Sequence, residues 1–264
     1  MYLGASLAVG LFQLVNPATV AWLRLVGAAV VLVVWRRPER AAWGGRRLLL
    51  AGGFGLVTAV MNIAFYEAIA RLPLGTAVAV EFCGPVVVAA LSSRGLRDWL
   101  ALLAAAIGVV LVSDARWAVA PGGMLWALAA AFAWAGYIVL AKRVAVGGDG
   151  VDGMAVGFVA AAALLAPLAA GSGPVWGDGR LLALAVGVGV LSSVVPYALD
   201  QVVLRRIGRA RFSVLLALLP VTAAVVGLLV LHQVPGPLEC AGVGAVVVAV
   251  ALRSKADDEP VPAS

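Results

Sequence analysis

The sequence has few charged residues. Only 12% of its 264 residues are charged, whereas 64% are hydrophobic and the mean hydropathy is +1.08. A soluble domain carries about 25% charged residues. A soluble helical protein of this size would therefore lack the polar side chains that its surface needs. The composition argues against a large soluble domain and indicates a protein of the lipid bilayer.

Cysteine and histidine are also scarce. Cys83 and Cys240 both lie in apolar segments, and two such residues form neither a disulfide framework nor a metal-binding motif. His232 is the single histidine and has no metal-ligand residues beside it in the sequence. The glycine-rich stretch 147–150 lacks the lysine of a phosphate-binding loop. We therefore predict no enzymatic activity, no cofactor and no metal site.

The net charge of +6 does not point to nucleic acid, because the basic residues sit in short clusters between apolar runs. Fifteen of the 19 Lys and Arg residues fall on one side of the predicted membrane topology, and only three fall on the other. An excess of Lys and Arg marks cytoplasmic loops. This bias predicts that both chain termini are cytoplasmic. The fifteen are Arg36, Arg37, Arg40, Arg46, Arg47, Arg94, Arg97, Lys142, Arg143, Arg205, Arg206, Arg209, Arg211, Arg253 and Lys255.

Long apolar runs divide the chain into candidate membrane spans. A spanning helix needs about 20 mostly apolar residues, and we predict ten such helices in an all-α integral membrane protein. Their connections are short, and residues 253–264 are predicted to be a disordered cytoplasmic tail. The ten spans are Met1–Val15, Ala18–Trp35, Leu48–Arg71, Gly75–Ser93, Trp99–Ser113, Gly122–Ala145, Val151–Ala170, Arg180–Leu204, Ala210–Leu231 and Pro235–Leu252.

The first span is short. As a helix, Met1–Val15 would be about 22 Å long, compared with a hydrocarbon core of about 30 Å. We expect either a translation start upstream of Met1 or a helix accommodated by local thinning and snorkelling. No positive charge precedes this run, so we do not predict a cleaved signal peptide.

The chain repeats with a shift of 135 residues. This shift pairs Asn62 with Tyr197, Arg71 with Arg206, Leu72 with Ile207 and Pro85 with Pro220. Each repeat, 1–115 and 122–252, has five predicted spans, and the odd number inverts the second repeat in the membrane. Inverted repeats are typical of secondary transporters, whose substrate site lies between the repeats near the midplane.

Four ionisable residues interrupt the predicted spans and are weighed as functional groups: Arg24, Glu67, Glu81 and Asp200. Ionisable residues inside the membrane are costly and usually functional. Arg24 and Glu81 each lie about 9 Å from the outer end of their helices, so we predict that they are at similar depth and could pair. In the alternative interpretation, Arg24 is only a structural counter-ion, Glu67 reaches outer water, and Asp200 pairs with Arg205 or snorkels inward.

Uncharged polar and aromatic residues extend this set. Asn62 and Tyr66 share one helix face, as do Tyr197 and Asp200. Trp134 and Tyr137 are predicted to lie near the middle of one span, and prolines such as Pro85 free a backbone carbonyl. The predicted substrate-binding or coupling residues are Arg24, Asn62, Tyr66, Glu81, Pro85, Trp134, Tyr137, Tyr197 and Asp200.

These residues form a family-like pattern. It comprises Asn62, Phe65-Tyr66, Ala68-Ile69, Pro73-Leu74-Gly75, Ala77-Val78, Glu81-Phe82, Gly84-Pro85 and Ser92-Ser93-Arg94. The pattern resembles the threonine/homoserine exporters, which are EamA-type drug/metabolite transporters. The resemblance implies ten spans in two inverted five-helix repeats, a bacterial inner-membrane location and export of small amino-acid-like metabolites in exchange for protons. The chain departs from the family pattern at Leu219 before Pro220, at His232-Gln233 and at Asp200.

Three functional hypotheses follow. The first is an exporter of small amino acids that works by alternating access and proton antiport. The second is a drug or general metabolite exporter, and the third, of another class, is a membrane scaffold subunit without a substrate. The expected partners are the lipid bilayer, a small amino-acid-like substrate and protons, but not nucleic acid. A homodimer is compatible with the sequence.

Overall fold

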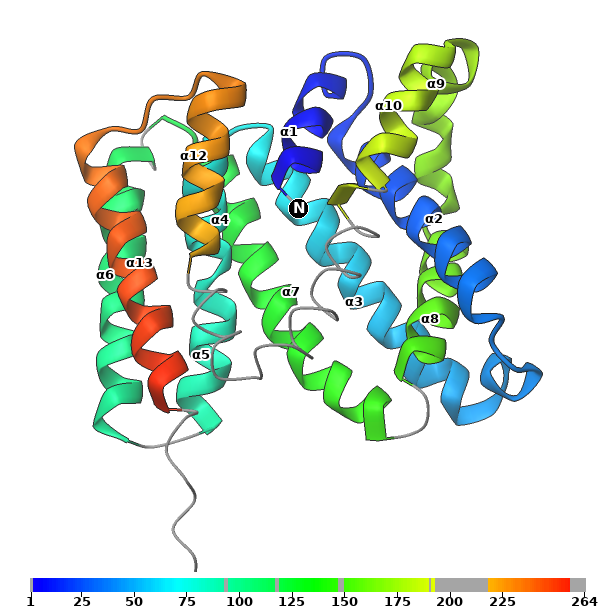
Figure 1. Ribbon diagram of the computed structural model, residues 1–264, viewed down its shortest axis with the longest axis horizontal. Helices are drawn as coiled ribbons and strands as arrows, with labels where there is room; N and C mark the ends of the chain where they lie inside the picture. The colour runs from blue at the N-terminus through cyan, green and yellow to red at the C-terminus, as the bar shows by residue number, and fades with distance from the viewer. Residues whose placement is uncertain are drawn as a thin grey trace, which may run out of the picture.

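The structure is a computed structural model, and it describes residues 2–92, 95–116, 119–146, 150–189, 191–192 and 218–256. Throughout this part of the chain the regular elements are helices, which confirms the predicted all-α class (Figure 1). The elements are α1 (Tyr2–Leu11), α2 (Pro17–Arg36), η1 (Arg40–Trp43), α3 (Gly45–Ile69), α4 (Leu74–Glu81), α5 (Cys83–Ser92), α6 (Leu96–Arg116), α7 (Pro121–Val146), α8 (Gly150–Leu164), η2 (Ala166–Ser172), α9 (Gly173–Gly177), α10 (Gly179–Gly189), α12 (Leu219–Leu231) and α13 (Pro237–Ala256).

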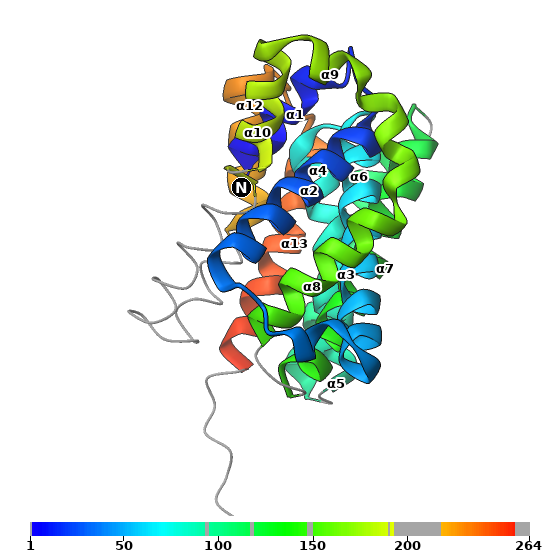
Figure 2. The ribbon, with the colours of Figure 1, turned by 90° about the vertical axis from the view of Figure 1, so that its right-hand side faces the viewer.

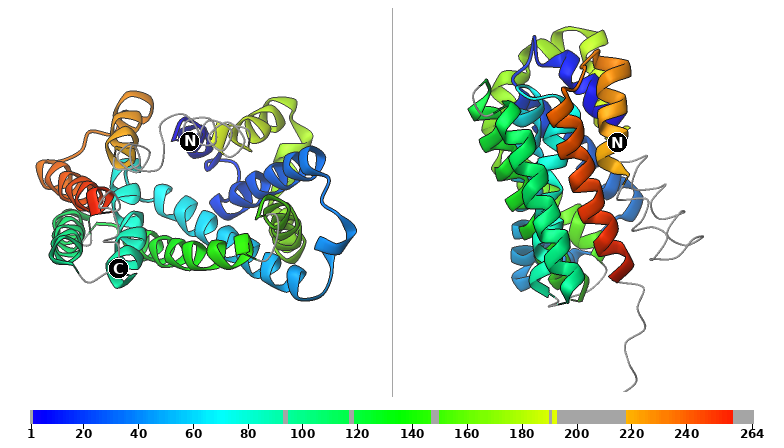
Figure 3. Two further views of the ribbon diagram at one scale, coloured as in Figure 1. Left: turned by 60° about the horizontal axis from the view of Figure 1, so that its bottom comes forward. Right: turned by 90° about the vertical axis from the view of Figure 1, so that its left-hand side faces the viewer.

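Helices from the first half of the chain pack against helices from the second half. α6 packs along α13, and α4 packs against α12 (Figure 3). α3 packs against both α7 and α8, while α2 lies beside α8 (Figure 2). The two predicted repeats are therefore intertwined, and each tightly packed group of helices takes members from both.

Each predicted span overlaps an apolar helix, but the helices differ in length. Pro17–Arg36, Gly45–Ile69 and Pro121–Leu140 are long and apolar enough to cross a membrane on their own. A fourth candidate is a bent pair, Asp152–Leu164 with Ala166–Gly177, in which the two parts are inclined by 67°. The remaining apolar helices in the described residues are shorter, so the number of ten spans stays a prediction.

Two predicted spans are broken in the structure, and proline accounts for both breaks. The predicted span Val151–Ala170 is wrong as a single helix, because α8 ends at Leu164 and a 3₁₀ segment containing Pro167 follows. The predicted span Gly75–Ser93 is divided at Phe82 into α4 and α5. Pro85 has no N–H to donate to the carbonyl of Glu81, which is four residues earlier.

The first and last helices also end at other residues than predicted. α1 ends at Leu11, before Val15, because Asn16 and Pro17 start a new helix: the Asn16 side chain accepts a hydrogen bond from Ala18 N at 2.9 Å. At the other end, α13 continues to Ala256 through residues 253–256, which were predicted to begin the disordered tail.

Close backbone contact fixes α5 against α7. A Cβ atom at Gly84 would lie only 2.0 Å from the carbonyl oxygen of Ala131 on α7. Small residues allow such approaches, and van der Waals contact of this kind drives helix association in a bilayer. The break between α4 and α5 is therefore held beside the middle of α7.

Candidate functional site

The candidate site is built around Arg24, a buried cation on α2. Its side chain is only 8% exposed. Its Nη2 donates a hydrogen bond to the carbonyl oxygen of Ser192 at 3.1 Å, and its guanidinium carbon lies 5.7 Å from the ring centroid of Tyr66. A backbone acceptor and an aromatic face reduce the cost of burying the cation.

Tyr66 brings α3 to the same place. The residue is completely buried, and its ring packs against Phe12 and Phe65 with centroid distances of 5.8 and 6.1 Å. Among the described residues, neither the Tyr66 hydroxyl nor the Ser192 hydroxyl has a hydrogen-bond partner, although both are buried. Buried polar atoms of native proteins are nearly always paired. Two hydroxyls with unused hydrogen-bonding capacity therefore belong to the residues that contact Arg24.

Glu81 is the last residue of α4 and is 6% exposed. It interacts electrostatically with Arg24 on α2 and with Tyr2 on α1. The ion pairs in contact within the described residues are Arg36–Asp152 and Glu67–Arg71, and Glu81 belongs to neither. Arg24 and Glu81 are thus both buried and interact electrostatically with each other.

Aromatic residues of α7 contribute to the wall of this region. The ring of Trp134 meets that of Phe82 edge-on, with the centroids 4.7 Å apart and the planes at 80°. Phe82 directly follows Glu81, so Trp134 lies beside the helix break. Tyr137 packs elsewhere on α3, with its ring centroid 5.0 Å from that of Phe54.

The other predicted residues are less directly connected to Arg24. The Asn62 side chain donates to the carbonyl oxygen of Thr58 in its own helix at 2.9 Å. Glu67 pairs with Arg71 and is 7% exposed, so it does not reach open water. Tyr197 and Asp200 lie outside the described residues. The structure therefore brings together Arg24, Tyr66 and Glu81, with Trp134 beside them.

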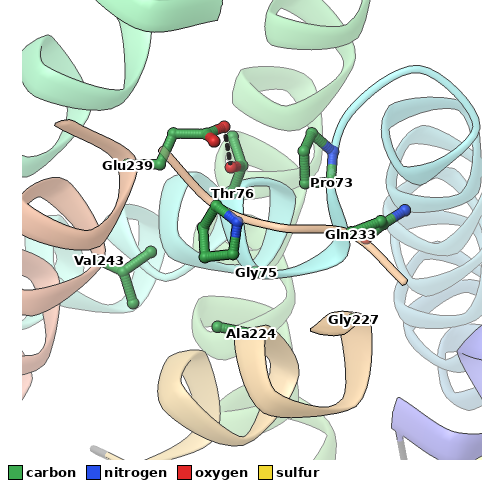
Figure 4. Close-up of a pocket in the computed structure, with 9 residues that line it drawn as sticks. Pro73, Gly75, Thr76, Ala224, Gly227, Gln233, Glu239 and Val243 are labelled. Atoms are coloured by element: carbon green, nitrogen blue, oxygen red, sulfur yellow. Dashed lines mark hydrogen bonds between the residues drawn. The ribbon is translucent and has the colours of Figure 1, made fainter. Parts of the chain in front are cut away.

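Sequence reasoning missed a second polar cluster at the N-terminal end of α4 (Figure 4). The Thr76 hydroxyl donates to Glu239 Oε1 at 2.9 Å, and both residues are only 2% exposed. Glu239 Oε2 accepts from Gly236 N, and Gln233 Oε1 accepts from Leu74 N, each at 2.9 Å. The spacing of Gly236 and Glu239 before an apolar run is a capping signal that was available in the sequence, whereas the contacts with α4 were not.

Known proteins resemble this chain in both sequence and fold. The model of the EamA-like transporter family matches residues 121–254. The threonine/homoserine exporter RhtA of Escherichia coli (strain K12) is 32% identical over 250 residues, covering 93% of this chain and 84% of that protein. RhtA of Salmonella typhimurium (strain SL1344) is 35% identical over 235 residues, covering 87% and 79% of the two chains.

One solved structure, described only as a crystal structure of a protein, superposes with a TM-score of 0.59 over 98% of this chain and 97% of that chain. At 18% identity this likeness concerns the fold alone. The sequence relatives are the stronger finding, because they span most of both chains and share about a third of their residues. The chain belongs to the EamA-like transporter family.

Proposed function

We propose that the protein exports small amino acids of the threonine and homoserine type across a bacterial cytoplasmic membrane, in exchange for protons. The observation that carries this proposal is the buried group formed by Arg24, Tyr66 and Glu81. Opposite charges kept inside a membrane protein mark substrate and ion pathways. The names of the two exporters support the substrate class.

The chemistry of the site matches a zwitterion. An amino acid carries a carboxylate, which the Arg24 guanidinium is suited to bind. Its ammonium group is attracted to a carboxylate such as Glu81. The unused hydroxyls of Tyr66 and Ser192 are available to a polar substrate. A small molecule bound between Arg24 and Glu81 would meet one charge at each end.

Glu81 is the group that we assign to proton coupling. Burial disfavours a charged carboxyl group, whereas a nearby guanidinium favours it. Binding of a substrate between Arg24 and Glu81 alters both influences at once. The affinity of Glu81 for a proton then depends on whether substrate is bound and on which side of the membrane has access to the site.

The architecture that we propose has ten spans in two inverted repeats, residues 1–115 and 122–252, with both termini in the cytoplasm. A simple model would let the two repeats rock against each other. The packing instead favours motion between mixed groups, because α6 packs along α13, and α3 packs along α7 and α8. We therefore propose that alternating access moves these mixed groups rather than the intact repeats.

Transport into inverted membrane vesicles tests this function directly. Vesicles acidified inside should accumulate labelled threonine or homoserine only when they contain the protein, and an uncoupler that collapses the pH gradient should reduce the accumulation. A panel that includes lipophilic drugs tests the alternative of a general exporter. Absence of transport for the whole panel, despite correct insertion, would favour the scaffold hypothesis and contradict the proposal.

A further inference from the structure

We propose that Glu239 is a positioning residue that holds the N-terminal end of α4 and thereby sets the place of Glu81 at the other end of this helix. The proposal rests on the proposed function only in giving Glu81 its coupling role. The contacts that carry it lie entirely within the described residues, far from Arg24 in sequence and on different helices.

One carboxylate connects two helix N-termini. Glu239 is the third residue of α13, and its Oε2 accepts from Gly236 N, which is one half of a capping box. Its Oε1 accepts from the Thr76 hydroxyl in the first turn of α4. Negative charge is favourable at a helix N-terminus, and here a single buried side chain serves α4 and α13 together.

Gln233 makes a second connection to the same end of α4. Pro73, which precedes this helix, provides no side-chain cap, and the first amide of the helix, Leu74 N, donates to Gln233 Oε1 instead. Gln233 lies in the segment between α12 and α13. His232, with a φ of 54°, ends α12 in the left-handed conformation, and Gln233 N donates to Gly227 O at 3.0 Å.

α4 also touches α12 at backbone distance. A Cβ atom at Gly75 would lie 2.8 Å from the Cα atom of Ala224, so α4 fits against α12 only with glycine at this position. The N-terminal end of α4 is thus enclosed by α12, by the connecting segment and by the start of α13 (Figure 4).

The break after α4 makes the position of Glu81 depend on these contacts. α4 has eight residues and is about 10 Å long from Leu74 to Glu81. Every residue in it is buried, and Phe82 alone separates it from α5. Pro85, in the first turn of α5, leaves the carbonyl of Glu81 without its helical donor. Because the junction with α5 lacks one backbone hydrogen bond at Pro85, the position of α4 depends strongly on the contacts at its N-terminal end. Displacement at Thr76 is therefore transmitted to Glu81.

The test compares two substitutions at one position. Thr76→Val removes the hydroxyl with little change of shape, whereas Thr76→Ser keeps it. Thr58→Val is the matched control, because Thr58 is also buried but its hydroxyl bonds to Phe54 O within α3. Glu239→Gln is a second way to weaken the contact if Thr76→Val fails to fold.

Two measurements on the purified full-length protein need no substrate. The first is the rate of amide hydrogen exchange over residues 74–81, which should be about tenfold faster in Thr76→Val and in Glu239→Gln than in the unmodified protein. In Thr76→Ser and Thr58→Val this rate should stay within about twofold of that of the unmodified protein. The second is the pH profile of Glu81 labelling by dicyclohexylcarbodiimide, read by mass spectrometry. Its midpoint should move by at least about 0.5 pH in the same two variants.

Glu81 is buried and interacts with Arg24 of α2 and Tyr2 of α1, so a shifted midpoint reports a change in its burial or in its distance to these groups. Unchanged exchange over α4 would overturn the proposal. Faster exchange with an unchanged labelling profile would also overturn it, because the contact would then be structural only. Failure of vesicle transport by the unmodified protein would contradict the proposed function but leave both measurements decisive.

Discussion

The guanidinium of Arg24 lies 5.7 Å from the ring centroid of Tyr66, and the hydroxyl of the same tyrosine has no hydrogen-bond partner among the described residues. One side chain thus uses its aromatic face to accommodate a buried cation and keeps its polar tip unused. This separation of roles leads to a sharp prediction.

Tyr66→Phe keeps the aromatic face and removes the hydroxyl. Because the hydroxyl has no protein partner in the described part of the chain, the thermal stability of the purified protein should be unchanged or slightly higher. The KM for threonine should rise about five- to tenfold, the equivalent of one lost hydrogen bond of about 1 kcal/mol. Thermal melts and vesicle transport measure the two quantities. A destabilised variant with an unchanged KM would show that Tyr66 is structural.

Pro85→Ala restores an N–H opposite the freed carbonyl of Glu81. The variant should be more stable, by up to about 3 kcal/mol, because α4 and α5 can then join into one helix. Its maximal transport rate should fall, since Glu81 would lose its place at a helix end. Pro174→Ala, at the start of the separate helix α9, is the control. Faster transport by Pro85→Ala would contradict the role given to the break.

The charge bias predicts the orientation of the chain. A reporter that is active only in the cytoplasm should be active when fused after Ser264 and when inserted between α2 and α3, near Arg40. The same reporter should be inactive between α12 and α13, near Pro235. Activity of a periplasm-specific reporter after Ser264 would reverse the assignment.

Much of the fold was predictable because a helix surrounded by lipid needs a long apolar segment, and such segments can be recognised in the sequence. Each predicted span overlaps an apolar helix, although Arg180–Leu204 and Ala210–Leu231 extend beyond the described residues. The proximity of Arg24 and Glu81 was predicted by counting residues along their helices, and the two groups do interact electrostatically. The break at Pro85 follows from the missing N–H. The break after Leu164 was missed, although Pro167 gave the same signal, because the apolar run continues through it.

The contacts at the N-terminal end of α4 were not predictable in the same way. Thr76 and Glu239 are 163 residues apart and come from different predicted repeats. A capping pattern predicts hydrogen bonds only at the terminus of the helix that contains it, so the Gly236–Glu239 spacing points to α13 alone. The reach of the same carboxylate to α4 depends on the packing of α4 against α12 and α13, which no local pattern contains. Tyr197 and Asp200 stay predictions, because they lie outside the described residues.

The central claim is that Glu81 couples export to the proton gradient, and one variant tests it most directly. Glu81→Gln keeps the size and hydrogen bonding of the side chain but removes its charge. Glu39→Gln, the same change at an exposed position before η1, is the control. In inverted vesicles acidified inside, threonine accumulation by Glu81→Gln should fall to the level of vesicles without the protein, while the control accumulates normally and both variants insert equally. Accumulation by Glu81→Gln at the normal rate and with normal sensitivity to an uncoupler would contradict the account.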